Sequence, residues 1–307
     1  MIVVGSANMD LVVPVERRPG PGETVLGGDT TSGPGGKGAN TAVAAARLGT
    51  RVAMLGAVGR DPHGDQLLAA LRAAGVDTAL IRRSAHPTGA AYITVTPDGE
   101  NSIVVSPGAN AQVSEDDVDE AGELIGNAAV LFSVLEVPLA TVDRVARIAA
   151  DAGVRMVLNA SPVARVHPGT LAVTDPLIVN QHEAAWLLGD PWVDPAAHDP
   201  ARLATAVLAL GPRSVVVTLG ADGALAADAD GVTHVPAPQV TAVDTTGAGD
   251  AFAGALAAAL ACGSSLRAAA EFAVRVAAYS VTKPGAQSSY PDADEISRDP
   301  ASGAADS

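Results

Sequence analysis

The sequence is poor in several features that mark specialised classes of protein. Cys262 is the only cysteine among 307 residues, so an intrachain disulfide is impossible. Charged residues make up only 17% of the chain, and 19 basic residues stand against 34 acidic ones, which gives a formal net charge of −15. Such a chain repels nucleic acid and anionic lipid. We therefore expect no nucleic-acid partner, and a phosphate ligand must be bound by local donors.

The chain also lacks a long apolar run and a secretion signal. Its most apolar stretch, residues 251–262, is too short and too rich in alanine to cross a bilayer, and it predicts a packed helix. The first residues carry neither the basic segment nor the cleavage site of a signal peptide. We therefore expect no membrane partner and a cytoplasmic location, with Cys262 as a small core residue.

Hydrophobic residues, in contrast, make up 48% of the chain and can build a large core. Short β-branched runs without polar alternation predict strands that are buried on both faces of a parallel sheet, and segments with helical spacing lie between them. This alternation is typical of a doubly wound, mainly parallel α/β sheet flanked by helices. The predicted strands include residues 2–4, 155–158, 177–179 and 214–219, and the predicted helices include residues 38–48, 64–74, 139–152 and 200–210.

Two stretches interrupt the alternation. Residues 11–33 are rich in Pro, Gly and Thr, and residues 90–106 predict two strands joined by a turn at Pro97-Asp98-Gly99. We expect these two stretches to form a small β-sheet lid. The α/β domain then comprises residues 1–10, 34–89 and 107–293, and residues 294–307 form a polar C-terminal tail.

The strongest chemical signal is Asp-Thr-Thr-Gly-Ala-Gly-Asp at residues 244–250, directly before an apolar helical stretch. Small residues ahead of a helix leave backbone N–H groups uncovered at the positive end of its dipole, where an anion can bind. Asp250 could accept a proton from a hydroxyl beside this anion hole. The motif alone fits equally well a first-turn acid that only stabilises the dipole. Asp244 is a candidate cation ligand in the preceding loop.

Two further segments offer polar groups near the N-terminus. Residues 33–40 (Gly-Pro-Gly-Gly-Lys-Gly-Ala-Asn) do not form a Walker P-loop, because Thr31 and Gly38 occupy positions that need glycine and Ser or Thr. Asn8 and Asp10 follow the first strand, where open α/β sheets bind ligands and where amide and carboxylate groups suit vicinal hydroxyls. Each segment alone fits a plain loop or turn equally well.

Taken together, Gly-Gly-Lys-Gly-Ala-Asn (residues 35–40) and Asp-Thr-Thr-Gly-Ala-Gly-Asp resemble the two signatures of the ribokinase-type (PfkB) carbohydrate kinases, and the similarity runs to about Tyr290. The resemblance implies a ribokinase-like fold and ATP-dependent phosphorylation of a sugar's primary hydroxyl, with D-ribose as the leading acceptor. Another pentose, a ketohexose or a nucleoside such as pseudouridine remains an alternative. A non-catalytic sugar-binding protein on the same fold is a more distant one.

The resemblance also implies roles for individual residues. Asp250 would be the base, and Gly247, Ala248 and Gly249 would supply the anion hole. The residues implied to hold the sugar are Asn8, Asp10, Gly36, Lys37, Asn40 and Glu136, with Ala91 and Ile93 of the lid covering it. Those implied on the ATP side are Asn180 and Glu183, for the phosphates and Mg²⁺, and Thr218 and Gly220, which would line the groove.

An activating potassium ion and a homodimer formed through the lid are implied in the same way. The implied potassium ligands are Asp244, Thr246, Ser280, Lys283, Gly285 and Ser289, several of them through backbone carbonyls. One departure from the family pattern concerns the nucleotide. Val274 and Arg275 lie about where the family often has a His or Asn against adenine, so the nucleotide preference stays open.

Overall fold

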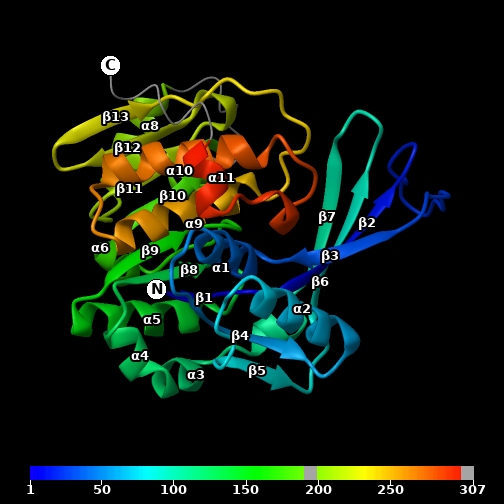
Figure 1. Cartoon of the computed structure of the whole chain (residues 1–307), viewed down its shortest axis with the longest axis horizontal. Helices are drawn as coiled ribbons and strands as arrows, with labels where there is room; N and C mark the ends of the chain where they lie inside the picture. Colours follow the sequence, from blue (N-terminus) through cyan, green and yellow to red (C-terminus); the bar gives the residue numbers. More distant parts are fainter. Residues whose placement is uncertain (190–198, 299–307) are drawn as a thin grey trace.

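The computed structural model describes residues 1–189 and 199–298 (Figure 1). Its strands are β1 (Ile2–Val4), β2 (Asn8–Pro14), β3 (Thr31–Gly35), β4 (Ala53–Gly59), β5 (Ile81–Ser84), β6 (Gly89–Val95), β7 (Asn101–Ser106), β8 (Val130–Val134), β9 (Arg155–Asn159), β10 (Thr174–Asn180), β11 (Val215–Thr218), β12 (Ala224–Asp228) and β13 (Gly231–Val235). Its α-helices are α1 (Lys37–Arg47), α2 (Pro62–Ala73), α3 (Glu115–Glu120), α4 (Gly122–Gly126), α5 (Leu139–Ala152), α6 (Pro168–Val173), α7 (Gln181–Leu187), α8 (Pro200–Leu208), α9 (Ala248–Ala261), α10 (Leu266–Ser280) and α11 (Ala293–Arg298), with 3₁₀ turns η1 (Gly108–Gln112), η3 (Gly220–Asp222) and η4 (Gln287–Ser289).

The larger of two sheets has the strand order β13-β12-β11-β10-β9-β8-β1-β4-β5. The strands from β11 to β5 pair in parallel, and β12 and β13 add an antiparallel edge. Each strand and helix predicted from the sequence is present, with ends shifted by at most a few residues. The predicted doubly wound, mainly parallel α/β fold is therefore confirmed.

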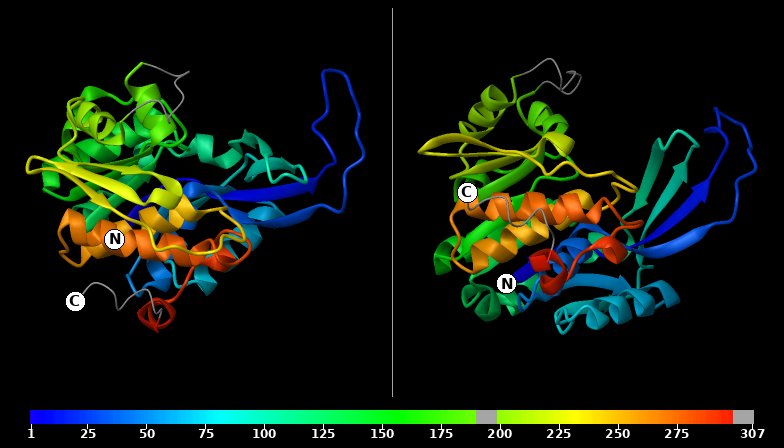
Figure 2. Two further views of the ribbon diagram at one scale, coloured as in Figure 1. Left: turned by 90° about the horizontal axis from the view of Figure 1, so that it is seen from above. Right: turned by 45° about the horizontal axis from the view of Figure 1, so that its top comes forward.

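The smaller sheet, which we call the lid, has the order β3-β2-β6-β7 and projects from the body of the molecule (Figure 2). Its strands begin or end within the two predicted stretches and also run beyond them, into residues 8–10, 34–35 and 89. Asn8 and Asp10 consequently lie in β2, a lid strand that starts just past the carboxyl end of β1, rather than in a turn. The lid is thus joined directly to the centre of the larger sheet.

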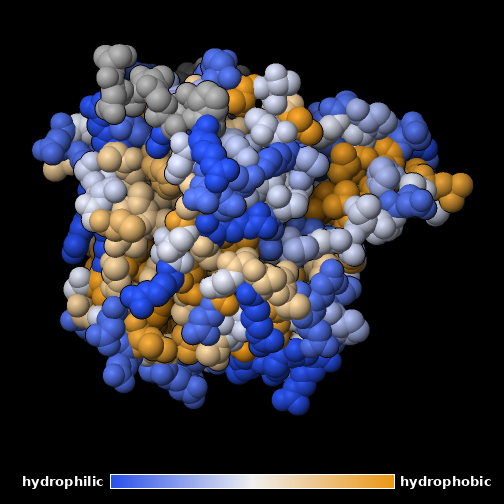
Figure 3. Space-filling model, viewed as in Figure 1, coloured by the Kyte–Doolittle hydropathy of each residue, from blue (hydrophilic) through white to orange (hydrophobic). Residues whose placement is uncertain are grey.

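Apolar side chains are exposed on the lid, where Figure 3 shows hydrophobic residues along the projecting sheet. Tyr92 is 53% exposed, Ile103 52%, Val104 69% and Val105 47%. The last three belong to β7, an edge strand whose residues are all exposed. An apolar edge strand of this kind is a surface that proteins usually cover.

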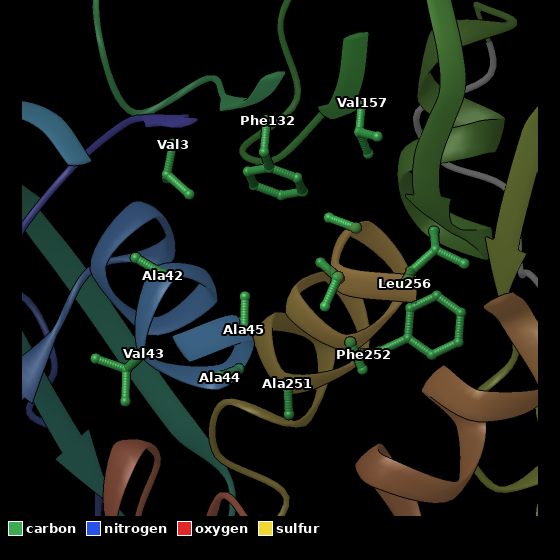
Figure 4. Close-up of a cluster of buried hydrophobic side chains, with 14 of the residues drawn as sticks. Val3, Ala42, Val43, Ala44, Ala45, Phe132, Val157, Ala251, Phe252 and Leu256 are labelled. Carbon is green, nitrogen blue, oxygen red and sulfur yellow. The ribbon is translucent and has the colours of Figure 1, made fainter. Parts of the chain in front are cut away.

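The larger sheet separates two hydrophobic clusters, because successive side chains of a strand point to opposite faces. Val3, Phe132 and Val157 face the cluster that includes α1, α9 and α10 (Figure 4). Val4 and Leu131 face the cluster on the other side, which includes α5 and α8. The larger sheet is therefore buried on both faces, as expected for strands without polar alternation.

Helices α1 and α9 cross closely on the first of these faces. A Cβ atom at Gly254 would lie 2.7 Å from both the carbonyl oxygen of Thr41 and the Cβ of Ala44. Only glycine allows this approach. The contact lies about one to two turns beyond the N-termini of both helices, so the first turn of α1 lies near the first turn of α9.

Two expectations need correction. Residues 294–298, predicted as part of a polar tail, belong to α11, where Ile296 is buried against the core. The remainder of the predicted tail lies outside the described residues. Cys262 is exposed at the end of α9 rather than buried.

Over the ranges 1–189 and 199–298, no helix is both long and apolar enough to span a bilayer.

Candidate active site

The N-terminus of α9 carries the features of an anion site. Gly247 is its N-cap, with a left-handed backbone (φ 73°), and a Cβ there would lie 2.5 Å from the hydroxyl of Tyr290. The amides of Gly247, Gly249 and Asp250 have no acceptor among the described residues, whereas Ala248 donates to the carbonyl of Thr245 at 3.2 Å. Uncovered amides at the positive end of a 14-residue helix favour an anion.

Asp250 lies in the first turn of α9 and is only 6% exposed. Asn40 donates to its Oδ2 at 2.8 Å, and the ammonium of Lys37 lies 4.0 Å from its Oδ1. Burial raises the pKa of Asp250, and Glu136 and Glu183 raise it further, while Lys37 and the hydrogen bond from Asn40 act in the opposite direction. A carboxylate with a raised pKa beside an anion hole is suited to accept a proton from a hydroxyl.

The glycines before α1 bring backbone and acidic groups together. Gly36 has φ 90°, and a Cβ there would lie 2.7 Å from the amide of Asn8, while a Cβ at Gly35 would overlap the carboxylate of Asp10. Glu136 accepts the amide of Lys37 at 3.0 Å and a short hydrogen bond from the hydroxyl of Ser6. The loop before α1 is thus pressed against β2 and against the end of β8.

Asp10 is an unusual acid in this cluster of residues. Burial raises its pKa to about 7, with further contributions from the nearby charges of Glu136 and Asp250. Asn8 is 2% exposed, and its Oδ1 accepts from the amide nitrogen of Asn110 at 2.7 Å. The side-chain nitrogen of Asn8, Nδ2, has no acceptor in the described part of the chain. Carboxylate and amide groups held in this way are suited to bind hydroxyl groups.

The lid places further residues beside Asp10. Asp10 is directly beside Ala91 in the register of β2 and β6, and Val12 is beside Ile93. Neighbouring residues of paired strands point to the same face. Ala91 and Ile93 therefore lie on the face of the lid that carries Asp10, as the predicted sugar-covering role requires.

A cavity of about 270 Å³ lies on the other side of the α9 N-terminus. Its lining includes Thr218 and Gly220, the two residues that the resemblance assigns to an ATP groove, and also Ala248 and Gly249 at the N-terminus of α9. The apolar part of its lining consists of Phe252, Val274, Ala277, Ala278 and Val281, among others. Val274 therefore offers the cavity an apolar wall, and Arg275 lies over the ring of Phe272 instead, 5.8 Å from its centroid.

Asn180 and Glu183 form a capping box at the start of α7. Asn180 accepts the amide of Glu183 at 2.8 Å, and Glu183 accepts the amide of Asn180 at the same distance. Their pairing is therefore structural in part. Glu183 still lies close enough to raise the pKa of Lys37, although Asp250 is the larger influence.

The loop before α9 is cross-linked to the loop after α10. Asp244 accepts the amide of Thr246 at 2.9 Å and the amide of Gly285 at 2.8 Å. Although burial acts against them, these hydrogen bonds hold the pKa of Asp244 below its ordinary value. Ser280 and Ser289 are buried, with hydroxyls bonded to backbone carbonyls, and the ammonium of Lys283 binds Glu295. The predicted cation ligands thus belong to two adjacent loops.

Four supporting side chains were not assigned roles from the sequence: Ser6, Asn110, Gln287 and Tyr290. Tyr290 donates to the carbonyl of Gly247 at 3.0 Å, and Gln287 donates to Asn40 at 2.9 Å. Asn110 and Gln287 lie within the stretch over which the family similarity runs, but no local pattern shows what they contact.

We expect Asp10→Asn to be more thermostable than the wild type at pH 8. With a pKa of about 7 in place of 3.8, the folded protein retains a proton that the unfolded chain releases. Wild-type stability therefore falls as the pH rises from about 4 to about 7 and stays reduced above that range, and asparagine removes this loss. Melting temperatures of both proteins from pH 4 to pH 8 measure the effect, with exposed Asp230→Asn as control. A difference independent of pH would contradict the assignment.

Comparison with known proteins agrees with the geometry. The chain matches the pfkB family carbohydrate kinase over residues 1–293. It is 39% identical over 295 residues to the ribokinase of Bacillus subtilis, covering 96% of this chain and 97% of the relative. It is 37% identical over 296 residues to the deoxyribokinase of Salmonella typhimurium, covering 96% of each. The structure of Arabidopsis thaliana ribokinase complexed with ribose and ATP aligns with a TM-score of 0.85 at 31% identity and 96% coverage of both chains. The chain therefore belongs to the pfkB family of carbohydrate kinases.

Proposed function

We propose that the protein transfers the γ-phosphoryl group of ATP to the primary hydroxyl of D-ribose, giving D-ribose 5-phosphate. One observation carries the proposal. The N-terminus of α9 presents free amides and the carboxylate of Asp250 between an apolar cavity and a pocket of hydroxyl-binding groups. The names of the most similar relatives support the same reaction. Since ATP is a cytoplasmic cosubstrate, we expect the enzyme to work in the cytoplasm.

In the proposed mechanism, Asp250 accepts the proton of the sugar's primary hydroxyl while that oxygen attacks the γ-phosphorus. The free amides at Gly247 and Gly249 stabilise the charge on the phosphoryl group in transfer. Asn8, Asp10 and Lys37 would hold the sugar in the orientation that in-line attack requires. Ala248 contributes to the anion hole through its place in the turn, since its amide already has an acceptor.

Mg²⁺ bound with the nucleotide would supply the charge neutralisation that phosphoryl transfer needs. The residues nearest to this role are Asn180 and Glu183, at the end of β10 and the start of α7. The described residues contain no cluster of three or more His, Cys, Asp or Glu side chains able to hold a metal ion. This suits an ion carried mainly by phosphate oxygens.

Ribose has one competitor with specific support, 2-deoxyribose, because a deoxyribokinase is nearly as similar to this chain as the ribokinases are. A site that binds a hydroxyl with buried polar groups discriminates strongly against an analogue that lacks it. Asn8 and Asp10 are buried or half-buried groups of this kind. We therefore favour ribose.

The test is ADP release with a panel of ribose, 2-deoxyribose, fructose and pseudouridine. We expect the highest kcat/KM with ribose, and we expect Asp250→Asn to lose roughly 10²- to 10⁴-fold in kcat with little change in sugar affinity, as general-base catalysis predicts. A nucleoside used far better than ribose would overturn the acceptor assignment. Near-normal turnover by Asp250→Asn would overturn the mechanism.

We further propose that potassium binds between the two loops that Asp244 cross-links. The donor set consists of one carboxylate, held charged by its hydrogen bonds, with serine and threonine hydroxyls and backbone carbonyls nearby. Oxygen donors of low total charge suit a monovalent cation better than a divalent one. The residues that would hold it are Asp244, Thr246, Ser280, Lys283, Gly285 and Ser289.

If this is correct, replacing potassium by sodium lowers kcat, because the cation orders the loop that leads into the anion hole. Initial rates in 100 mM KCl and 100 mM NaCl at equal ionic strength measure the difference. Choline chloride serves as the control for salt. Equal rates in all three salts would remove the potassium site from the proposal.

We also propose that the lid pairs with the lid of a second copy to form a homodimer. The face that carries Asp10 continues through Val12, Ile93 and Ile103, which lie side by side across the sheet. Ile103 is 52% exposed, because the strand carrying it is at the edge of the sheet. A second apolar surface would cover this face and close the sugar pocket from outside.

Light scattering coupled to size-exclusion chromatography tests the dimer. We expect the wild type to elute with twice the 30.4 kDa mass of the chain and Ile103→Asp to elute as a monomer with weakened ribose binding. Val232→Asp, on the exposed edge strand β13, is the matched control and should remain dimeric. A monomeric wild type would contradict the proposal.

A further inference from the structure

The base is oriented by a chain of side-chain amides. Gln287 Nε2 donates to Oδ1 of Asn40 at 2.9 Å, and Asn40 Nδ2 donates to Oδ2 of Asp250 at 2.8 Å. The three residues are only 7%, 5% and 6% exposed, in that order. The ionised carboxylate of Asp250 only accepts, so it takes the donor end of Asn40, and the donor of Gln287 binds the acceptor end that remains.

We propose that Gln287 is a positioning residue for the base, which holds Asn40 so that it donates to Oδ2 of Asp250 and leaves Oδ1 for the acceptor hydroxyl. This inference rests on the proposed function. In the reaction, the proton of the hydroxyl moves to Oδ1 as the new O–P bond forms and the bond between the γ-phosphorus and ADP breaks. Lys37 lies on the same side, 4.0 Å from Oδ1.

The opposite orientation of Asn40 is unfavourable. Its Oδ1 would face Oδ2 of Asp250, which places two acceptors together without a proton in a buried site. Gln287 adds to this preference, because in the opposite orientation its nitrogen would face the nitrogen of Asn40 instead of Oδ1. It can do so reliably because η4 packs beside α1 and is preceded by Gly285, whose amide is bound by Asp244 at 2.8 Å.

Gln287 acts on the base through Asn40 and not through a charge. The ionisable groups that influence Asp250 or are influenced by it are Lys37 on α1, Glu136 after β8, Glu183 on α7, Asp10 on β2 and Tyr290 after η4. No described ionisable side chain hydrogen-bonds to Gln287. Burial raises the pKa of Asp250, and the hydrogen bond from Asn40 is one of the two influences that lower it. Losing that bond therefore raises the pKa further.

The experiment compares kcat and KM between pH 5.5 and pH 9 for the wild type and two variants that keep the side-chain volume. Gln287→Met removes the donor, and Gln287→Glu replaces it with an acceptor that competes with Asp250 for the donor end of Asn40. We expect kcat at pH 6 to fall on the order of tenfold in Gln287→Met and more in Gln287→Glu. The acid limb of the kcat profile moves to higher pH in both, so the loss shrinks toward pH 9, and KM for ATP stays unchanged.

Ser288→Ala is the matched control, since Ser288 is in the same turn and its hydroxyl only donates to the carbonyl of Pro284 at 2.9 Å. It should retain the wild-type profile. An unmoved acid limb in both Gln287 variants, with or without a uniform loss of rate, would overturn the inference and leave Gln287 a structural residue. A wild type that phosphorylates no sugar would contradict the proposed function instead, so the two failures are distinguishable.

Discussion

The close crossing of α1 and α9 is the constraint on which the site depends. Gly254 lets the two helices approach closely, and the contact lies about one to two turns from both N-termini. Lys37 and Asn40 in the first turn of α1 are thereby brought to Asp250 in the first turn of α9. A side chain at position 254 would separate the helices, and Asp250 would lose its contacts with Asn40 and Lys37.

The first turns of α1 and α9 also carry the groups that can attract an anion to this acidic protein. A chain with a formal net charge of −15 repels ATP and sugar phosphates at a distance, so attraction has to be local. The uncovered amides of α9 and the ammonium of Lys37 supply it. Lys37 lies among Asp250, Glu136 and Glu183, and the charge of Asp250 is the main reason that its pKa is raised. The acids around Lys37 thus keep it protonated, while their mutual repulsion and burial leave Asp250 and Asp10 less acidic.

Much of this could be predicted from the sequence, because strands without polar alternation and helices with small residues leave local patterns. The parallel sheet, the lid strand pair at residues 89–106 and the position of Asp250 in the first turn of a helix are of this kind. The support of the site was not predictable in this way. Gln287 and Tyr290 are 247 and 43 residues from the groups they bind, and no periodicity relates such positions.

The errors have equally physical causes. Asn8 and Asp10 do follow the first strand, but residues 8–10 were assigned to the α/β domain, whereas pairing with β3 and β6 makes them part of the lid. Cys262 was expected to be buried because it ends an apolar run, yet the run ends with the helix and leaves the thiol outside. Val274 does line the apolar cavity that we propose to bind the nucleotide, so the departure noted at that position lies in the wall of this cavity.

The connection between the two sheets has a mechanical consequence. Only Gly5, Ser6 and Ala7 separate β1, at the centre of the large sheet, from β2 of the lid. The lid carries Asp10, while Asp250 belongs to the body. A molecule bound by both residues would therefore link the lid to the body, in addition to the three-residue connection. Such a bound molecule would restrict movement of the lid relative to the body about residues 5–7. The substrate is therefore part of the structure that holds it.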